Sequence, residues 1–385
     1  MRSLLTASAL VLPESVVNDA WLLIEDGTVH SFGTRGDGLP QHAEQHDLPG
    51  ALLAPALFDI HVHGAAGHDV MEGAQEGVAH VSTLLAQHGV GAWLPTLVTA
   101  ATDRTLRALD GLATLIEQQT LPGAAPLGIH MEGPFLSYKK RGVHPPEFLQ
   151  APSIELFDRF WQVSRGNVRL ITIAPELPGA LELIQHASSL GVRVSLGHSD
   201  ATAAETRAGI AAGGVSSTHT YNAMRGLEHR EPGMLGVVLD QEDLFAEIIA
   251  DGHHVDPVAV RIFWHSKGPA RAILITDGLS ATGMPEGHYT LGSFEVDVVN
   301  GVCMHGDTVA GSILTLDRAV KNFAEFTHAP LATVTRLGSA NPAALTGFAD
   351  SHGAIAAGRR ADIVAFSPEG QLVATCIAGR FARVQ

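Results

Sequence analysis

Five short apolar segments of the chain end in, or are followed by, side chains that bind metal ions. These side chains belong to His61, His63, Glu132, His198, His219 and Asp277. Imidazole and carboxylate groups together suit Zn²⁺, Fe²⁺, Co²⁺ or Mn²⁺, and the set contains no cysteine, which disfavours a purely structural thiolate site. His61 and His63 stand two positions apart, so in a strand both would point to the same face and could reach one ion. The pattern predicts a catalytic metal site.

Each of these residues also has a simpler explanation when it is considered alone. Asp277 precedes Gly278, and Glu132 precedes Gly133-Pro134, so either could be a turn residue. His198 and His219 could be hydrogen-bonded histidines of the core. These coincidences would all have to fall at the ends of separate apolar runs, on one face of one barrel. We therefore favour the metal site.

The predicted elements place these residues at one end of a barrel. From residue 51 onwards, short apolar runs alternate with longer helical stretches, which indicates a parallel sheet covered by helices. Eight such runs are typical of a closed (β/α)₈ barrel, or TIM barrel, whose active site lies at the C-terminal ends of the strands. The predicted strands are Leu57–Val62, Ala92–Val98, Leu127–Met131, Val168–Ala174, Val192–Leu196, Val215–Thr218, Phe245–Ala250 and Ala272–Thr276. The predicted helices between them include Gly77–Gln87, Thr102–Gln118, Ala180–Ser189, Ala201–Ala212 and Pro257–Ser266.

The two ends of the chain have a different sequence pattern from the barrel region. Residues 1–50 and 350–385 alternate short apolar segments with turn signals such as Asp26-Gly27. We expect these two segments to pair into one small β-sandwich domain, with residues 51–349 forming the metal-dependent barrel domain. After the eighth run, a β-like stretch over Gly287–Met304 precedes helices around Leu316–Phe326 and Leu331–Leu337.

The composition excludes several classes of function. The formal net charge is −16, which repels nucleic acid and anionic membranes, and no apolar stretch approaches the roughly 18 residues of a membrane span. The N-terminal run MRSLLTASALVLP lacks a following A-x-A-like cleavage site, so we do not expect a signal peptide. Cys303 and Cys376 lack metal-like spacing and are predicted to be inert thiols. A cytoplasmic location is the default expectation.

Several segments resemble the signatures of the N-acetylglucosamine-6-phosphate deacetylase family of the amidohydrolase superfamily. They are GIHMEGPF (128–135), APE (174–176), GHSDAT (197–202), THTYNAM (218–224), REPG (230–233), DGHHV (251–255), TDGLSATG (276–283), VAGS (309–312) and NPA (341–343). The tail GAIAAGRRADIVAF (353–366) is similar to that of many amidohydrolases, whereas the M-E-G-P and Y-N-A-M segments resemble the deacetylases themselves. The resemblance covers essentially the whole chain.

The resemblance implies metal-dependent deacetylation of N-acetyl-D-glucosamine 6-phosphate to D-glucosamine 6-phosphate and acetate, in amino-sugar catabolism. It implies that Glu132, His198 and His219 hold the principal ion, with Zn²⁺ the leading choice, and that Asp277 is the catalytic base and then acid. His144 would polarise the acetyl carbonyl. The implied substrate-binding residues are Val143, His144, Asn222, Ala223, Arg230 and His254, with Val309, Ala310 and Gly311 of a closing loop. The family is dimeric, and Arg230 would reach into the neighbouring subunit of a homodimer.

Two departures from the family pattern bear on these expectations. Some members have Gln-x-Asn where this chain has His61-Val62-His63, and the histidine version can support a second ion, with His61, His63 and Asp277 as its ligands and Glu132 as a bridge. Whether each subunit binds one ion or two is therefore open. The usual P-G-F-I-D entry to the first strand is here Pro55-Ala56-Leu57-Phe58-Asp59, a change that we expect to be neutral.

Two alternative functions remain open at this point. A related amidohydrolase could act on N-acetylgalactosamine 6-phosphate or on an N-acyl amino acid, because barrels share one metal face among many substrates. A catalytically silent sugar-phosphate-binding protein could also keep the barrel, although the intact ligand set argues against it.

Overall fold

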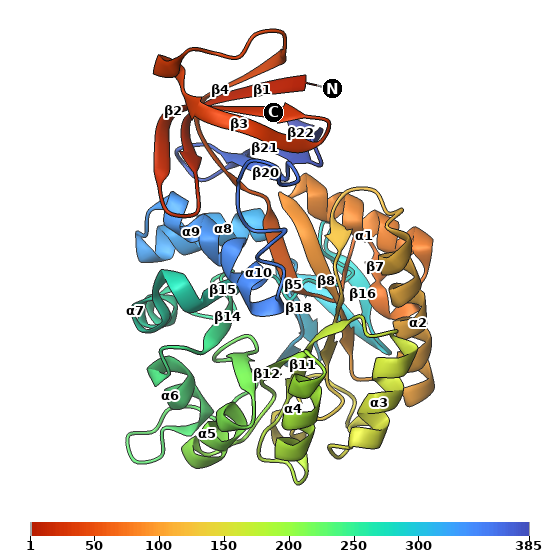
Figure 1. Ribbon diagram of the computed structural model, residues 1–385. Helices are drawn as coiled ribbons and strands as arrows, with labels where there is room; N and C mark the ends of the chain where they lie inside the picture. The colour runs from red at the N-terminus through yellow and green to blue at the C-terminus, as the bar shows by residue number, and fades with distance from the viewer. Residues whose placement is uncertain (1, 385) are drawn as a thin grey trace.

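The computed structural model describes residues 2–384, and a closed barrel dominates it (Figure 1). Eight parallel strands form the barrel wall, in the order in which they occur along the chain. They are β5 (Leu57–Val62), β8 (Val90–Val98), β10 (Ile129–Glu132), β11 (Val168–Ile173), β12 (Arg193–Leu196), β13 (Gly214–Ser217), β14 (Phe245–Ile249) and β15 (Ala272–Ile275). Each predicted strand is confirmed, with bounds that differ by at most two residues.

The first and last strands close the barrel through side-chain and backbone contacts. Val62 and Gly278 form a parallel bridge just beyond the two strands. Below it, the buried carboxylate of Asp59 on β5 accepts a 2.6 Å hydrogen bond from the hydroxyl of Thr276, which follows β15. The prediction of a (β/α)₈ barrel is therefore confirmed.

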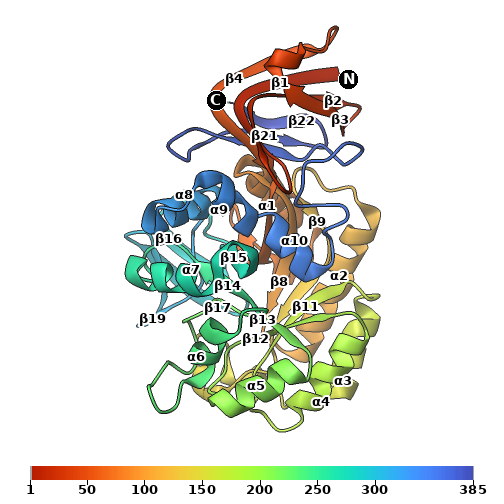
Figure 2. The same cartoon turned by 60° about the vertical axis from the view of Figure 1, so that its left-hand side comes forward.

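Helices surround this sheet, as both views show (Figures 1 and 2). Those that follow the strands are α1 (Gln75–Gln87), α2 (Thr102–Gln118), α3 (Ile154–Val163), α4 (Ala180–Ser189), α5 (Ala203–Ala211), α6 (Gly233–Asp240) and α7 (Pro257–Arg271), and three more, α8 (Leu316–Thr327), α9 (Leu331–Leu337) and α10 (Ala340–Thr346), come after β15. In α2 the inner face is Ala108, Leu109 and Leu112, all buried, whereas Asp103 in its first turn suits the positive end of the helix dipole. The strands themselves are buried on both faces, as β8 illustrates, so they read as continuous apolar runs.

Strands from both ends of the chain lie in one separate seven-stranded sheet. Its members are β1 (Arg2–Val11), β2 (Val16–Glu25), β3 (Thr28–Thr34), β4 (Glu44–Pro55), β20 (Ile363–Phe366), β21 (Leu372–Ile377) and β22 (Arg380–Val384). β4 joins the two halves, because it pairs with β1 along one part and with β20 along the other. The red strands β1–β4 lie over the blue strands β20–β22 in Figure 1, around a core of their own. The small β unit expected from the two ends is thus present.

A third, four-stranded sheet follows the barrel's last strand. It comprises β16 (Gly287–Leu291), β17 (Phe294–Val299), β18 (Val302–His305) and β19 (Thr308–Val309), which confirms the β-like character predicted for Gly287–Met304. A small apolar cluster that includes Leu279, Val296 and Ala310 holds this sheet against the end of β15. The segment from 279 to 311 leaves and re-enters the barrel at nearly one point, because Gly278 and Ser312 form a parallel bridge.

The remaining elements are short connections. They are β6 (Gly64–Ala65), β7 (His68–Asp69), β9 (Ala125–Pro126) and the 3₁₀ turns Arg35–Asp37, Val70–Glu72, Tyr138–Lys140 and Pro146–Phe148. Cys303 and Cys376 are both buried and unpaired, and burial raises the pKa of each thiol to about 12, which keeps both in the unreactive thiol form. Among residues 2–384, no helix is both long and apolar enough to cross a lipid bilayer.

Candidate metal centre and substrate pocket

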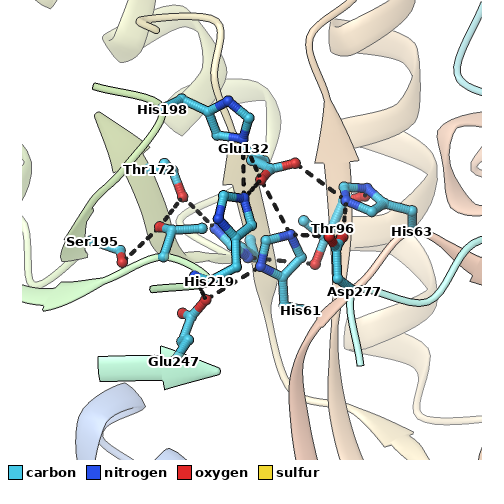
Figure 3. A network of polar contacts seen from close by, with 12 residues as sticks. His61, His63, Thr96, Glu132, Thr172, Ser195, His198, His219, Glu247 and Asp277 are labelled. Carbon is cyan, nitrogen blue, oxygen red and sulfur yellow. Dashed lines mark hydrogen bonds and ion pairs between the residues drawn. The ribbon is translucent and has the colours of Figure 1, made fainter. Parts of the chain in front are cut away.

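Two groups of potential metal ligands meet at the C-terminal ends of the barrel strands and share Glu132 (Figure 3). In the first group, His198 Nε2 and His219 Nε2 lie 3.1 Å from each other, and they lie 3.1 Å and 3.0 Å from Glu132 Oε1. Ligands at 2.0–2.1 Å from a tetrahedral zinc ion are about 3.3 Å apart, so the three sides of this triangle are close to the edges of such a site. All three residues are buried.

The second group lies on the other side of Glu132. His61 Nε2 is 3.4 Å from Glu132 Oε1 and from Asp277 Oδ1. His63 Nε2 is 3.2 Å from Glu132 Oε2 and 3.1 Å from Asp277 Oδ1. The structure therefore places together all six residues that were predicted as metal ligands. Glu132 contacts both groups, with Oε1 facing His198, His219 and His61 and Oε2 facing His63.

Hydrogen bonds to the far nitrogen aim three of the four imidazoles at the centre. The Nδ1 atoms of His198 and His63 lie 2.9 Å and 3.0 Å from the carbonyl oxygens of Lys140 and Thr96, so each Nδ1 carries the proton. His61 Nδ1 faces the carboxylate of Glu247 at 3.3 Å. In the neutral ring each Nε2 then has a lone pair, which is the form that a metal ion requires. The Nε2 atoms of His198 and His219 face each other at 3.1 Å, and this donor set fits a bound cation.

Three of the site residues have a backbone conformation that L-residues rarely adopt. His198, His219 and Asp277, each just after a strand, have φ values of 49°, 26° and 52°. Such left-handed residues are strained by about 1–3 kcal/mol each, and strain of this kind concentrates at functional sites, where the surrounding structure enforces it. The strand ends thus turn these side chains inward at the expense of local stability.

The electrostatics of the metal-free site are set by the proximity of buried acids and imidazoles. Burial lowers the pKa of His198 to about 4, so its ring is neutral near pH 7. Burial opposes protonation of His63, but Asp277 and Glu132 outweigh it and raise the pKa to about 9. Burial alone would raise the pKa of Asp277, but His61 and His63 lower it to about 2. The Asp277 carboxylate is therefore ionised and can accept a proton.

A pocket of about 360 Å³ opens above this centre. Most of the predicted substrate-binding residues line it, namely Val143, His144, Asn222, Ala223, His254, Val309 and Gly311. Ala310 does not line the pocket, because its side chain is buried in the apolar cluster beneath the four-stranded sheet. Arg230 also lies outside it, on an exposed loop before α6. His61 lies fully buried below the pocket floor.

Two histidines of the pocket present a polar atom to whatever is bound. The backbone N–H of Thr99 donates to His144 Nδ1 at 3.3 Å, so His144 carries its proton on Nε2, which lies 3.4 Å from Glu132 Oε2. His254 Nδ1 is held by Asp251 Oδ2 at 2.7 Å. Burial opposes the charged form of His254, but Asp251 outweighs it and raises its pKa. His144 can thus donate a hydrogen bond from Nε2 beside the metal ligands. His254, whose charged form is favoured, can bind an anionic group.

The pocket and its floor contain residues that the sequence analysis did not select. Lys139 and Lys140 line the pocket, and Glu247 and Thr96 contact the histidines from behind. A signal existed for Glu247, since it is a charged residue in the middle of the apolar run FAEIIA. The lysines gave no comparable signal, because charged residues in a loop between strands are ordinary surface residues.

Comparisons with known proteins agree with this geometry. The model of the Amidohydrolase family matches residues 52–382. An N-acetylgalactosamine-6-phosphate deacetylase of Escherichia coli O157:H7 is 39% identical over 366 residues, which are 95% of each chain. An N-acetylglucosamine-6-phosphate deacetylase of Vibrio furnissii is 37% identical over 92% of this chain and 88% of its own. The structure of a mutant N-acetyl-D-glucosamine-6-phosphate deacetylase of Mycobacterium smegmatis, in complex with N-acetyl-D-glucosamine 6-phosphate, superposes with a TM-score of 0.93 at 34% identity over 99% of both chains.

More distant structures, such as a Xaa-Pro dipeptidase at 13% identity and a TM-score of 0.63, share the fold alone. The family model spans most of the chain, and relatives above 30% identity cover nearly all of it. The chain belongs to the amidohydrolase family and, within it, to the N-acetylglucosamine-6-phosphate deacetylases.

Proposed function

We propose that this protein hydrolyses the acetamide of N-acetyl-D-glucosamine 6-phosphate and releases acetate and D-glucosamine 6-phosphate. The observation that carries the proposal is one pocket in which two metal-ligand groups, an ionised carboxylate and a histidine donor converge. The relatives that bear this activity in their names are similar over nearly the whole chain.

Hydrolysis of an amide requires an activated water molecule and a polarised carbonyl, and the metal ligands can provide both through a bound ion. We propose that Glu132, His198 and His219 hold the principal divalent ion, with Zn²⁺ the leading choice, and that His61, His63 and Asp277 complete a second site. A divalent ion bound in such a centre lowers the pKa of water to about 7 and polarises a carbonyl oxygen.

The chain's own residues move the protons and stabilise the charge. Asp277, ionised near pH 7, accepts the proton of the attacking water and returns it to the amide nitrogen, so that the amine can leave. His144 donates from Nε2 to the acetyl oxygen as negative charge develops there. Both groups border the metal ligands, so the acetyl carbon must lie between them.

Phosphate recognition needs positive charge in a chain whose formal net charge is −16. His254 supplies it from inside the pocket, and Lys139 and Lys140 line the same wall. We propose that Arg230, whose loop is exposed, reaches the pocket of the second subunit in a homodimer.

The decisive test is acetate release by metal-loaded protein from three substrates. N-acetylglucosamine 6-phosphate should be turned over fastest, N-acetylgalactosamine 6-phosphate more slowly, and an N-acetyl amino acid least. The galactosamine compound is included because one relative is named for it. Failure to release acetate from N-acetylglucosamine 6-phosphate would refute the proposal, and a preference for either other substrate would reassign it.

A further inference from the structure

Glu247 is a buried acid beneath the metal centre that none of the proposed catalytic steps uses. It lies on β14 with no exposed surface, on the side of His61 that faces away from Glu132 (Figure 3). Its Oε2 is 3.3 Å from His61 Nδ1 and 3.3 Å from the backbone nitrogen of His219. Its other oxygen, Oε1, is buried without a hydrogen-bond partner.

These contacts hold one ligand from each of the two metal groups. The His219 N–H donates to Glu247, and the backbone oxygen of Glu247 in turn accepts from Thr220 at 2.8 Å. The ring of His61 is enclosed by the rings of His63, His130 and His219, whose centroids lie 4.6–5.6 Å away. His61 can therefore satisfy its Nδ1 at Glu247 and present only its Nε2 to Glu132 and Asp277.

The acids of the centre have imidazole partners only. Glu132, Asp277 and Glu247 are three buried acidic side chains, and no lysine or arginine within residues 2–384 forms an ion pair with any of them. His61 lies between two of them, because its Nδ1 faces Glu247 and its Nε2 faces Asp277. Glu247 is therefore connected to the second ligand group through His61.

We propose that Glu247 is a positioning residue that retains the second metal ion. It fixes His61 with the proton on Nδ1 and the lone pair of Nε2 directed between Glu132 and Asp277. This inference rests on the proposed two-ion function of the same site. Partners that orient metal-bound histidines in this way typically contribute about 10- to 100-fold to metal affinity.

The test measures Zn²⁺ binding to the full chain rather than activity. Protein stripped with a chelator is titrated calorimetrically with Zn²⁺, and the bound metal is counted by elemental analysis after gel filtration. Glu247→Ala should weaken binding of the second ion by about 10- to 100-fold and binding of the first ion much less, because Glu247 contacts His219 only at its backbone nitrogen. Glu247→Gln should fall between Glu247→Ala and the unmodified protein, because its amide oxygen still accepts from His61 Nδ1 but carries no charge.

Two control variants give the expected limits of the result. His61→Gln removes the ligand itself and should reproduce the loss of the second ion, whereas Glu242→Gln makes the same chemical change at an exposed position nearby and should alter neither ion. Thermal unfolding of the metal-free variants separates a folding defect from a metal defect. If Glu247→Ala does not fold, Glu247→Gln decides the question.

The outcomes distinguish this inference from the function on which it rests. Two ions bound equally well by the unmodified protein and by the folded Glu247 variants overturn the positioning role alone. If the unmodified protein binds a single ion at excess Zn²⁺, both the second site and this role are overturned. The proposed deacetylase activity would still stand, because acetate release tests it separately.

Discussion

Glu132 is the residue on which the chemistry of this site depends most. Its two oxygens contact the side chains of all four histidine ligands, through Oε1 to His198, His219 and His61 and through Oε2 to His63. Burial opposes its charge, but the surrounding histidines hold its pKa well below the usual value. A carboxylate held in this state contacts ligands on both of its sides, whereas the Asp277 side chain pairs, among the described residues, with His61 and His63.

Asp277→Asn should lower kcat by about 10²- to 10⁴-fold, because the amide cannot take up or return a proton. The principal ion should stay bound, since Asp277 is outside the Glu132–His198–His219 group. Acetate release and elemental analysis of the same sample check both statements. Asp350→Asn, at an exposed position far from the pocket lining in sequence, serves as control. Unchanged turnover in Asp277→Asn would show that another group moves the protons.

His144→Phe should lower kcat more than it changes KM, because the Nε2–H bond to the acetyl oxygen strengthens only as charge develops. We expect a loss of about 10²-fold or more, the scale of a removed oxyanion donor. His144→Gln, whose amide can still donate, should recover part of the rate. A loss confined to KM would instead assign His144 to ground-state binding.

At the scale of elements, closure of the barrel depends on a polar contact between its first and last strands. Asp59 accepts from Thr276 Oγ1 at 2.6 Å and from the backbone nitrogen of His61 at 3.2 Å, and it has no exposed surface. Burial raises its pKa to about 7 despite these bonds. The contact therefore fixes the metal-bearing end of β5 against the strand that delivers Asp277.

Thr276→Val should lower the free energy of unfolding by about 1–3 kcal/mol, because it leaves the buried Asp59 carboxyl short of a donor at nearly constant side-chain volume. Urea denaturation of the metal-free protein measures the change. The same substitution at the exposed Thr120, whose hydroxyl makes no hydrogen bond within residues 2–384, should change stability little. If Thr276→Val is as stable as Thr120→Val, the Asp59 contact does not hold the barrel closed.

The elements were the part of this molecule most open to prediction from sequence. Each barrel strand is a short apolar run buried on both faces, and the run stops where a polar ligand begins, so strand and site were found together. Helices α3, α6 and α10 were missed, and α6 is an example of why. Its sequence, GMLGVVLD, starts with glycine and lacks helical periodicity, so only its tertiary contacts make it helical.

Contacts between strands were beyond the reach of sequence reasoning. Spacing indicates that His61 and Glu247 belong to strands far apart in the chain, at 186 residues, but not that their side chains meet. The same holds for Lys139 and Lys140, which reach the pocket only because their 3₁₀ turn packs beside His198. Site residues were predicted where the pattern of a single strand indicates them. They were missed where their role depends on a contact between two segments that are distant in sequence.

At the scale of the whole molecule, the seam between the barrel and the terminal sheet contains a pH-sensitive group. His352 packs near Phe58 and Phe348, and its Nε2 is buried without a partner. Burial, assisted by Arg360 and Arg359, lowers its pKa to about 4. The unfolded chain, with the ordinary value of 6.5, therefore binds this proton more readily than the folded one between pH 6.5 and 4.

The free energy of unfolding should consequently fall as the pH drops from 6.5 to 4, by on the order of 2 kcal/mol from this group. His352→Gln removes the titration, so its curve of stability against pH should be flatter than that of the unmodified protein in this window. His229→Gln, at an exposed loop position, should leave the curve unchanged. Parallel curves for His352→Gln and the unmodified protein would contradict the assignment.

The proposed dimer makes a prediction about two defective proteins mixed together. Arg230→Ala lacks the loop arginine, and Asp277→Asn lacks the base. If Arg230 acts across the interface, each mixed dimer contains one intact site, and random exchange of subunits should restore about a quarter of full activity. Acetate release after co-refolding measures it. If the mixture is only as active as the two variants measured separately and added, Arg230 acts in the site of its own subunit or in no site at all.

The four-stranded sheet over the pocket has a consequence for how such enzymes could diversify. Residues 279–311 depart from the end of β15 and return beside it, since Gly278 pairs with Ser312 and the Leu279 backbone nitrogen donates to the Ser312 oxygen at 3.1 Å. The segment also carries Val309 and Gly311, which border the pocket, yet none of the metal ligands. Sequence changes in this segment would therefore reshape the wall of the pocket and leave the metal ligands in place.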